Sequence, residues 1–434
     1  MKDNVLVKKI GNGRFIFMIL LIIECFVKNI PSLIFGKYAI LFICFLTLLL
    51  LLYRALFFPN MLFGKKHILK YLLIVTIVLS SVINNSIKDY NNVVVLVTFI
   101  ILLFLVDNFD EKENLNYVMN EFVIIARFTT LLHLFYSIAS LINAICESTF
   151  NIAGLIGLSN FYAYNCVTVI GLLVFLLLFD KSIYLRAFDA VNLSFHILIL
   201  FFTQLRSAFI GIFFAILIII YLLLSNGSVK FNLSKFIRYC ATVMIIYLGL
   251  AYLLSRFTSV DYSWVIKKIT TFTISGREII WPVTIACFLT GNLVFGFSYS
   301  KLPIVFANYV DNVLNVSTDS NNYYAYWIAK QGTSVHNIYL QQLCAHGIIG
   351  FVLMAIYVID IVKKYFLIIK SSFIHNFDVF CLLSCFAFTI FAQLFISFFD
   401  NNLFFNIIYI SNILFFYSAG MIRFIVNRVD NNDK

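Results

Sequence analysis

Long runs of apolar residues, separated by short polar segments, make up most of the chain. A helix needs about 20 mostly apolar residues to cross a bilayer, and twelve runs reach or approach this length. The expected spans are Phe15–Val27, Ala39–Phe57, Leu69–Val82, Val93–Val106, Val118–Ala144, Tyr162–Phe179, Leu193–Thr203, Ala208–Leu224, Ile237–Leu254, Ile338–Tyr357, Val379–Phe398 and Leu403–Ile422. Because the whole chain holds only four prolines, most spans are expected to be unbroken helices. The pattern predicts an all-α polytopic membrane protein.

Basic residues indicate which side of the membrane each loop occupies. With a cytoplasmic N-terminus, 20 Lys and Arg residues fall in cytoplasmic segments, and only four fall in short external loops: Lys28, Lys37, Lys88 and Arg206. Cytoplasmic loops of membrane proteins carry an excess of Lys and Arg. Both termini are therefore expected in the cytoplasm, which agrees with an even number of spans.

One connection, residues 255–337 between the ninth and tenth expected spans, is too long for a simple turn. Loops of this length usually carry function. Its apolar run Ile279–Phe297 contains Pro282, and a thirteenth span there would place the lysines at 363–370 outside. We therefore expect an amphipathic or interfacial helix lying over the bundle. The chain is expected to form one membrane domain, residues 1–434, that includes this external loop subdomain.

Composition narrows the class of protein further. Hydrophobic residues make up 62% of the chain and charged residues 12%, which is too little charge for the surface of a soluble domain. A soluble enzyme and a nucleic-acid-binding protein are excluded, and the net charge of +11 is explained by the loop bias. The nine cysteines are scattered and form no metal-ligand pattern, so neither a metal nor a cofactor is expected. The acids Asp107, Asp110, Glu111 and Glu113 are expected to form a solvated cytoplasmic turn.

Three basic residues on the expected external side are candidates for chemistry. Arg206 lies where the seventh span turns into the eighth, Arg277 precedes the apolar run of the long loop, and His336 lies where that loop re-enters the membrane. Guanidinium groups match phosphate oxygens and keep their charge, so the two arginines suit a lipid-linked pyrophosphate. A histidine can act as a general base near neutral pH. Snorkelling at the interface is the alternative for each residue taken singly.

Arg127 differs from these three because it lies about nine residues into the fifth expected span. A charge at that depth is costly. It is expected either to pair with a buried polar group or to face an internal cavity as a substrate-binding cation.

Five segments stand out in order around these residues: Leu205-Arg206-Ser207-Ala208-Phe209-Ile210-Gly211, Ser275-Gly276-Arg277-Glu278-Ile279-Ile280-Trp281, Leu293-Val294-Phe295-Gly296-Phe297, Ser334-Val335-His336-Asn337-Ile338-Tyr339-Leu340-Gln341 and His346-Gly347-Ile348-Ile349-Gly350. Together they resemble the O-antigen ligase/polymerase superfamily, the Wzy/WaaL-like membrane glycosyltransferases. Ser207, where the family usually has Gly, and His346, where an acid is common, depart from the family pattern.

The resemblance implies a GT-C-like fold and an inverting, metal-independent glycosyl transfer on the periplasmic or external face of the bacterial inner membrane. The donor would be a glycan on undecaprenyl pyrophosphate. Arg206 and Arg277 would bind the pyrophosphate, and His336 would deprotonate the acceptor hydroxyl. Substrate-binding candidates are Asn337, Glu278 and, with packing as their alternative role, Tyr299 and Trp281.

Three functions compete on these grounds. A polymerase would join lipid-linked repeat units into O-antigen or capsular polysaccharide, with a chain-length regulator as a possible partner besides the membrane lipid. A ligase of the same superfamily would transfer the finished glycan to lipid A-core, completing lipopolysaccharide, or to a protein. A flippase or transporter would require polar residues along several spans, whereas the expected spans here are apolar and the basic motifs lie in loops. We favour the polymerase.

Overall fold

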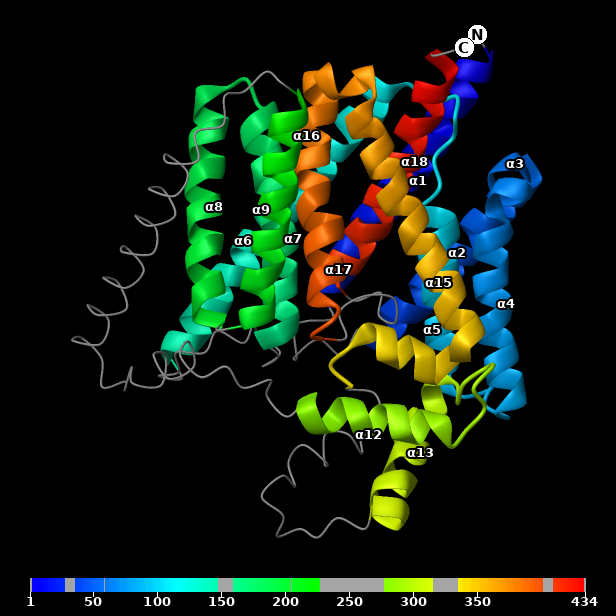
Figure 1. Cartoon of the computed structure of the whole chain (residues 1–434). Helices are drawn as coiled ribbons and strands as arrows, with labels where there is room; N and C mark the ends of the chain where they lie inside the picture. Colours follow the sequence, from blue (N-terminus) through cyan, green and yellow to red (C-terminus); the bar gives the residue numbers. More distant parts are fainter. Residues whose placement is uncertain are drawn as a thin grey trace, which may run out of the picture.

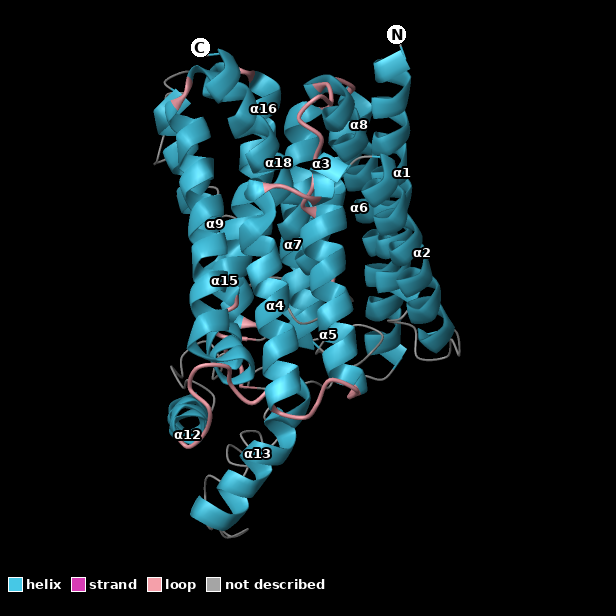
Figure 2. Cartoon of the chain, turned by 90° about the vertical axis from the view of Figure 1, so that its right-hand side faces the viewer, coloured by secondary structure: helices cyan, strands magenta, loops and turns pink. Residues whose placement is uncertain are grey.

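The computed structural model describes residues 2–27, 36–57, 59–146, 159–203, 205–226, 277–314, 335–400 and 409–432. Every regular element in these ranges is a helix (Figure 2). The α-helices are α1 (Lys2–Val27), α2 (Gly36–Phe57), α3 (Pro59–Leu62), α4 (Ile68–Ile83), α5 (Tyr90–Ile100), α6 (Leu115–Cys146), α7 (Ser159–Phe179), α8 (Ile183–Thr203), α9 (Arg206–Asn226), α12 (Arg277–Leu289), α13 (Leu302–Asn308), α15 (Ile338–Lys370), α16 (Phe377–Phe386), α17 (Gln393–Ile396) and α18 (Ile410–Asn432). Short 3-10 turns, η1 (Lys65–His67), η3 (Tyr299–Lys301) and η5 (Ser372–His375), and π turns, η2 (Ile101–Val106), η4 (Tyr309–Leu314) and η6 (Ala387–Ala392), link or extend them.

The prediction of an all-α membrane protein is confirmed at this level. Within the described ranges, seven helices are long and apolar enough to cross a membrane, and three shorter apolar helices accompany them. The predicted total of twelve spans stays a prediction, because the expected span Ile237–Leu254 lies outside the described residues.

The helices form one bundle whose middle is made by α7, α18 and the continuous α16–η6–α17 segment. These helices are buried along most of their length, whereas α8 and α9 leave much of their apolar surface exposed. In a bilayer such an apolar outer surface faces lipid. Both termini lie at one end of the bundle, and α12 and α13 lie at the other (Figure 1). The expected Ile279–Phe297 segment holds the 13-residue helix α12, which lies across the bundle rather than along it (Figures 1 and 2).

A sharp bend in α15 ties this end of the molecule together. Gly347, inside α15, has a left-handed backbone with φ of +68°, so the helix changes direction there (Figure 1). The loop before η3 supplies the hydrogen bonds that the bend leaves unmade. Phe297 N donates to Cys344 O at 2.8 Å, and Ile348 N donates to Leu293 O at 2.9 Å.

The acidic turn before α6 corrects one expectation. Asp107 and Glu113 are buried rather than solvated, at 3% and 0% exposure. Arg14 of α1 explains Glu113, because its guanidinium bonds both Glu113 and Glu121 through four hydrogen bonds of 2.7–3.0 Å. Buried carboxylates persist where a cation neutralises and hydrogen-bonds them, and here that cation comes from a helix distant in sequence.

Candidate functional site

The turn that follows α17, residues 397–400, contacts two of the three predicted catalytic residues, Arg277 and His336. It also contacts Ile338, the first residue of α15. Ser397 O accepts a hydrogen bond from Ile338 N at 3.0 Å, which fixes the start of α15 against the turn. Phe399 O accepts two hydrogen bonds from the Arg277 guanidinium, from Nε at 3.1 Å and from Nη2 at 2.5 Å. The same short turn therefore positions the starts of both α12 and α15.

Asp400 is the polar centre of this turn. Its carboxylate, 3% exposed, accepts hydrogen bonds from Asn160 Nδ2 at 2.7 Å and from the Tyr164 hydroxyl, both on α7. Its other oxygen, Oδ1, lies 3.3 Å from His336 Nδ1. An Asp beside one imidazole nitrogen fixes the ring orientation and leaves the other nitrogen as the basic one.

His336 is held in an unusual backbone conformation. Its φ is +51°, in the left-handed region that non-glycine residues seldom adopt and that is often found at functional sites. The next residue, Asn337, is the N-cap of α15, and its side chain accepts hydrogen bonds from Tyr339 N and Leu340 N. A capping interaction of this kind satisfies backbone groups at the helix start. The strained His336 is thus placed directly before a well-anchored helix.

The α12 helix brings the remaining candidates of the long loop to this end. Arg277 is its first residue, and Trp281, one turn later, packs in a small apolar cluster that includes Val335, the neighbour of His336. Glu278 is exposed in the first turn of α12. Tyr299, in η3, lies beside Gln341 of α15, and burial raises the pKa of the Tyr299 hydroxyl.

Arg206 begins α9 at the same end of the bundle. The next residue, Ser207, is buried, and its hydroxyl lies beside that of Tyr164, the Asp400 partner. The α9 helix packs closely against α17 because Gly211 has no side chain; a side chain there would collide with Ile396. Ser207, which replaces the usual family Gly, thus contributes a polar group next to the Asp400 cluster.

Arg127 does not join this cluster. Its guanidinium pairs with Asp180, just past the C-terminal end of α7, and with Asp189 of α8. Asn160 and Tyr164, the Asp400 partners, lie near the other end of α7. At 1.5 Å per residue, the roughly 20 residues between them span about 30 Å. The structure therefore favours the paired alternative for Arg127 over a place at the Asp400 cluster.

The arrangement combines an orientable base with a fixed cation. His336 beside Asp400 can accept a proton, and the Arg277 guanidinium is positioned near the Tyr164 hydroxyl and the turn. Such a set can activate a hydroxyl group and stabilise an anion. Across the described ranges, no three His, Cys, Asp or Glu side chains gather as a metal-binding group.

Asp400 was not among the site residues predicted from the sequence. A signal existed, because Asp400 is a lone acid in the short external turn expected between the last two spans. Its significance depends on contacts with Asn160, Tyr164 and His336, which come from parts of the chain that spacing alone does not bring together.

Comparison with known proteins supports the resemblance. A search of curated proteins gave no match. Residues 191–355 match the family described as "O-Antigen ligase", a segment that contains Arg206, Arg277 and His336 but neither Arg127 nor Asp400. The members of this family are membrane glycosyltransferase-like enzymes, which implies a lipid-linked glycan as substrate. This match supports the resemblance of the chain to the O-antigen ligase/polymerase superfamily, at a level that does not separate polymerases from ligases.

Proposed function

We propose that the chain polymerises oligosaccharide repeat units, carried on undecaprenyl pyrophosphate, into O-antigen or capsular polysaccharide. The observation that carries this proposal is the meeting of Arg277 and His336 at the turn 397–400, although 59 residues separate them in sequence. A base and a phosphate-binding cation on one turn are what a transfer from a diphosphate donor requires. The proposed site faces the external side of the inner membrane, in a GT-C-like fold.

In the proposed reaction His336 acts on the acceptor sugar. Asp400 holds Nδ1 of the ring, so Nε2 takes the proton of the acceptor hydroxyl as its oxygen forms a bond to the anomeric carbon of the donor. The bond from that carbon to the diphosphate oxygen breaks, and its electron pair leaves with the diphosphate. Attack from the face opposite the leaving group inverts the anomeric configuration.

The two arginines stabilise the departing diphosphate in this proposal. Guanidinium groups bind phosphate oxygens bidentately and cannot lose their charge. Arg277 is anchored by Phe399 O, and Arg206 is placed by the start of α9. Trp281 and Tyr299 would line the sugar path, with Asn337 serving mainly as the cap of α15. Arg127 would stabilise the fold by pairing with its two carboxylate partners and would not bind substrate.

A ligase is the second candidate, because the matched family is described as "O-Antigen ligase". The same site chemistry would serve it, since ligase and polymerase use the same kind of donor and differ in the acceptor. The acceptor would then be lipid A-core or a protein instead of the next lipid-linked repeat unit.

Electrophoresis of surface polysaccharide separates these functions. Deletion of the gene in its host should collapse the ladder to a single repeat unit on its anchor if the chain is the polymerase. Long chains that accumulate on the lipid carrier would identify a ligase and contradict the polymerase. An unchanged polysaccharide profile would contradict both the polymerase and the ligase and would favour a transporter.

Single substitutions then test the site. His336→Ala and Arg277→Ala should each fail to restore the ladder at normal protein levels. Arg186→Ala, at an exposed position near the start of α8, is the matched control and should restore it. If His336→Ala restores the ladder, His336 is not the general base of the reaction.

A further inference from the structure

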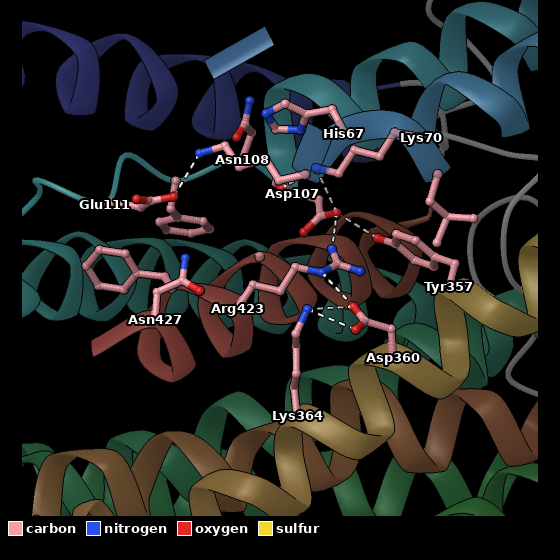
Figure 3. Close-up of a pocket in the computed structure, with 15 residues that line it drawn as sticks. His67, Lys70, Asp107, Asn108, Glu111, Tyr357, Asp360, Lys364, Arg423 and Asn427 are labelled. Carbon is pink, nitrogen blue, oxygen red and sulfur yellow. Dashed lines mark hydrogen bonds and ion pairs between the residues drawn. The ribbon is translucent and has the colours of Figure 1, made fainter. Parts of the chain in front are cut away.

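A polar cavity of about 260 Å³ (Figure 3) is lined by residues of elements that lie toward the end of the bundle that carries the termini, away from the Asp400 cluster. Its walls come from η1, the start of α4, the turn after η2 and the C-terminal halves of α15 and α18. The proposed transfer reaction uses none of these groups, so the cavity needs its own explanation.

Alternating charges form a connected chain along the wall. Lys70 lies 3.2 Å from Asp107, and Arg423 pairs with that same carboxylate. Arg423 also lies 3.2 Å from Asp360, which pairs with Lys364 at 2.9 Å. Three cations therefore share two carboxylates, and one positive charge is left without compensation (Figure 3). The adjoining pair of Lys66 and Glu111 is neutral as a unit.

His67 lies among these groups with its hydrogen-bonding capacity unused. The residue is 3% exposed and lines the cavity. Neither ring nitrogen makes a hydrogen bond of good geometry, although the backbone of Asn60 lies close enough to raise the pKa of the ring slightly. Burial, together with the positive charges of Lys70 and Lys66, lowers the pKa of His67 to about 4. The ring is therefore neutral near pH 7 and can both donate and accept a hydrogen bond.

Asp107, which also lines the cavity, has a carboxylate oxygen without a hydrogen-bond donor. Its Oδ2 accepts from Tyr357 at 2.8 Å and pairs with Lys70 and Arg423, but its buried Oδ1 has no hydrogen-bond partner. A buried carboxylate oxygen needs a donor. An anionic occupant of the cavity would balance the cation chain, and a hydroxyl on that occupant would give Asp107 a donor.

We propose that this cavity binds a phosphate group that carries or adjoins a hydroxyl, with His67, Lys364 and Arg423 as its principal contacts. Hydrogen phosphate and phosphate esters of polyols meet both requirements, because their anionic oxygens suit Arg and Lys and their hydroxyl can donate to Asp107. The carboxylates of Asp107 and Asp360 are already paired with cations, which limits their repulsion of the anion. Such a group can come from a soluble phosphate or from a lipid headgroup of the adjacent leaflet.

Binding of radiolabelled inorganic phosphate to the purified full-length protein in detergent, at constant ionic strength, tests the proposal. Saturable binding is expected for the wild type. His67→Phe keeps an aromatic ring and removes both nitrogens, and Lys364→Gln removes one partly exposed charge; each should weaken binding about tenfold, the size of one lost charge-assisted contact. Lys112→Gln, an exposed lysine of the neighbouring turn that does not line the cavity, should leave binding unchanged.

A second arm distinguishes the two sources. In nanodiscs, phosphatidylglycerol should raise the melting temperature of the wild type above that in phosphatidylcholine, and less so in the two variants, if a headgroup is the natural occupant. No effect of the lipid together with saturable phosphate binding indicates a soluble ligand. Absence of both effects, or equal phosphate binding by the wild type, His67→Phe and Lys364→Gln, would overturn the proposal and leave a cavity that holds water only. If His67→Phe does not purify as a monodisperse protein, Lys364→Gln decides the result.

Discussion

Asp400 connects residues that are far apart in the sequence to one point in the molecule. Its carboxylate holds the His336 ring, accepts hydrogen bonds from Asn160 and Tyr164, and follows directly on Phe399, whose carbonyl anchors Arg277. Removal of this one charge should therefore disturb the orientation of the proposed base more than the binding of the donor.

Asp400→Asn tests that division of roles. The amide has the same shape but can present an N–H to His336 Nδ1, which would stabilise the wrong tautomer of the ring. We expect kcat for transfer from a purified lipid-linked oligosaccharide to fall at least about a hundredfold, in the range of general-base contributions, with KM for the donor nearly unchanged.

Asp400→Glu provides the control for this variant. It keeps the carboxylate and should recover part of the lost kcat, which a purely structural role of the side chain would not predict. A large rise in KM with kcat retained would instead place Asp400 in donor binding.

The sequence could identify charged residues at the site but not their partners. Arg277 and His336 stand out because they are basic groups beside apolar segments, and that signal is local. The pairing of Arg127 with Asp180 and Asp189, and of Arg14 with Glu113, depends on which helices become neighbours. Spacing along one helix carries no information about that. Asp107 and Glu113 of the acidic turn were therefore wrongly expected to be solvated, and the role of Asp400 was missed.

At the scale of elements, the bend in α15 brings two glycine-containing segments of the family pattern, residues 293–297 and 346–350, into contact. Gly296 and Gly347 both have left-handed backbones, with φ of +69° and +68°. A side chain at either position would collide with the backbone of the other segment. The two segments therefore approach backbone to backbone, and this contact positions the first part of α15, which begins just after His336 and Asn337.

Gly347→Ala should damage the site without touching any polar residue in it. The left-handed conformation alone costs about 1–3 kcal/mol for a residue with a side chain, and the added Cβ would collide with the carbonyl of Val294. We expect a lower melting temperature and a loss of the polysaccharide ladder.

Gly13→Ala is the matched control, because Gly13 lies within α1 and its nearest side-chain neighbour would be 3.9 Å away. Alanine favours helix more than glycine does, so this variant should be unchanged or slightly more stable. Equal behaviour of the two variants would show that the bend is not required.

Elements were predicted better than residues, because a run of apolar residues is itself the cause of a membrane helix. The helix across the bundle was expected from the interrupted run Ile279–Phe297, and α12 is found there. Helix ends were less well predicted. The seventh expected span began at Leu193, but α8 begins at Ile183, because Asp189 is buried by its ion pair with Arg127 and does not end the helix.

At the scale of the whole molecule, the two ends of the bundle differ in chemistry. The end with the termini carries the buried ion pairs of Arg14 and the charged cavity, whereas the other end carries α12, α13 and the Asp400 cluster (Figure 1). The excess of Lys and Arg in the segments at the first end predicts that it is cytoplasmic. If so, the Asp400 cluster faces outward, where a lipid-linked glycan would be presented.

Cys146 provides a native probe of this orientation. It is the last residue of α6, a helix of 32 residues that is about 48 Å long and hence long enough to cross the bilayer. Its side chain is exposed. A membrane-impermeant maleimide should therefore label Cys146 of the wild-type protein on intact cells, or on spheroplasts of a host with an outer membrane, and Cys146→Ser should label less than the wild type. Labelling of Cys146 only after the membrane is permeabilised would invert the orientation, and would place the Asp400 cluster on the side where a transfer to surface polysaccharide could not occur.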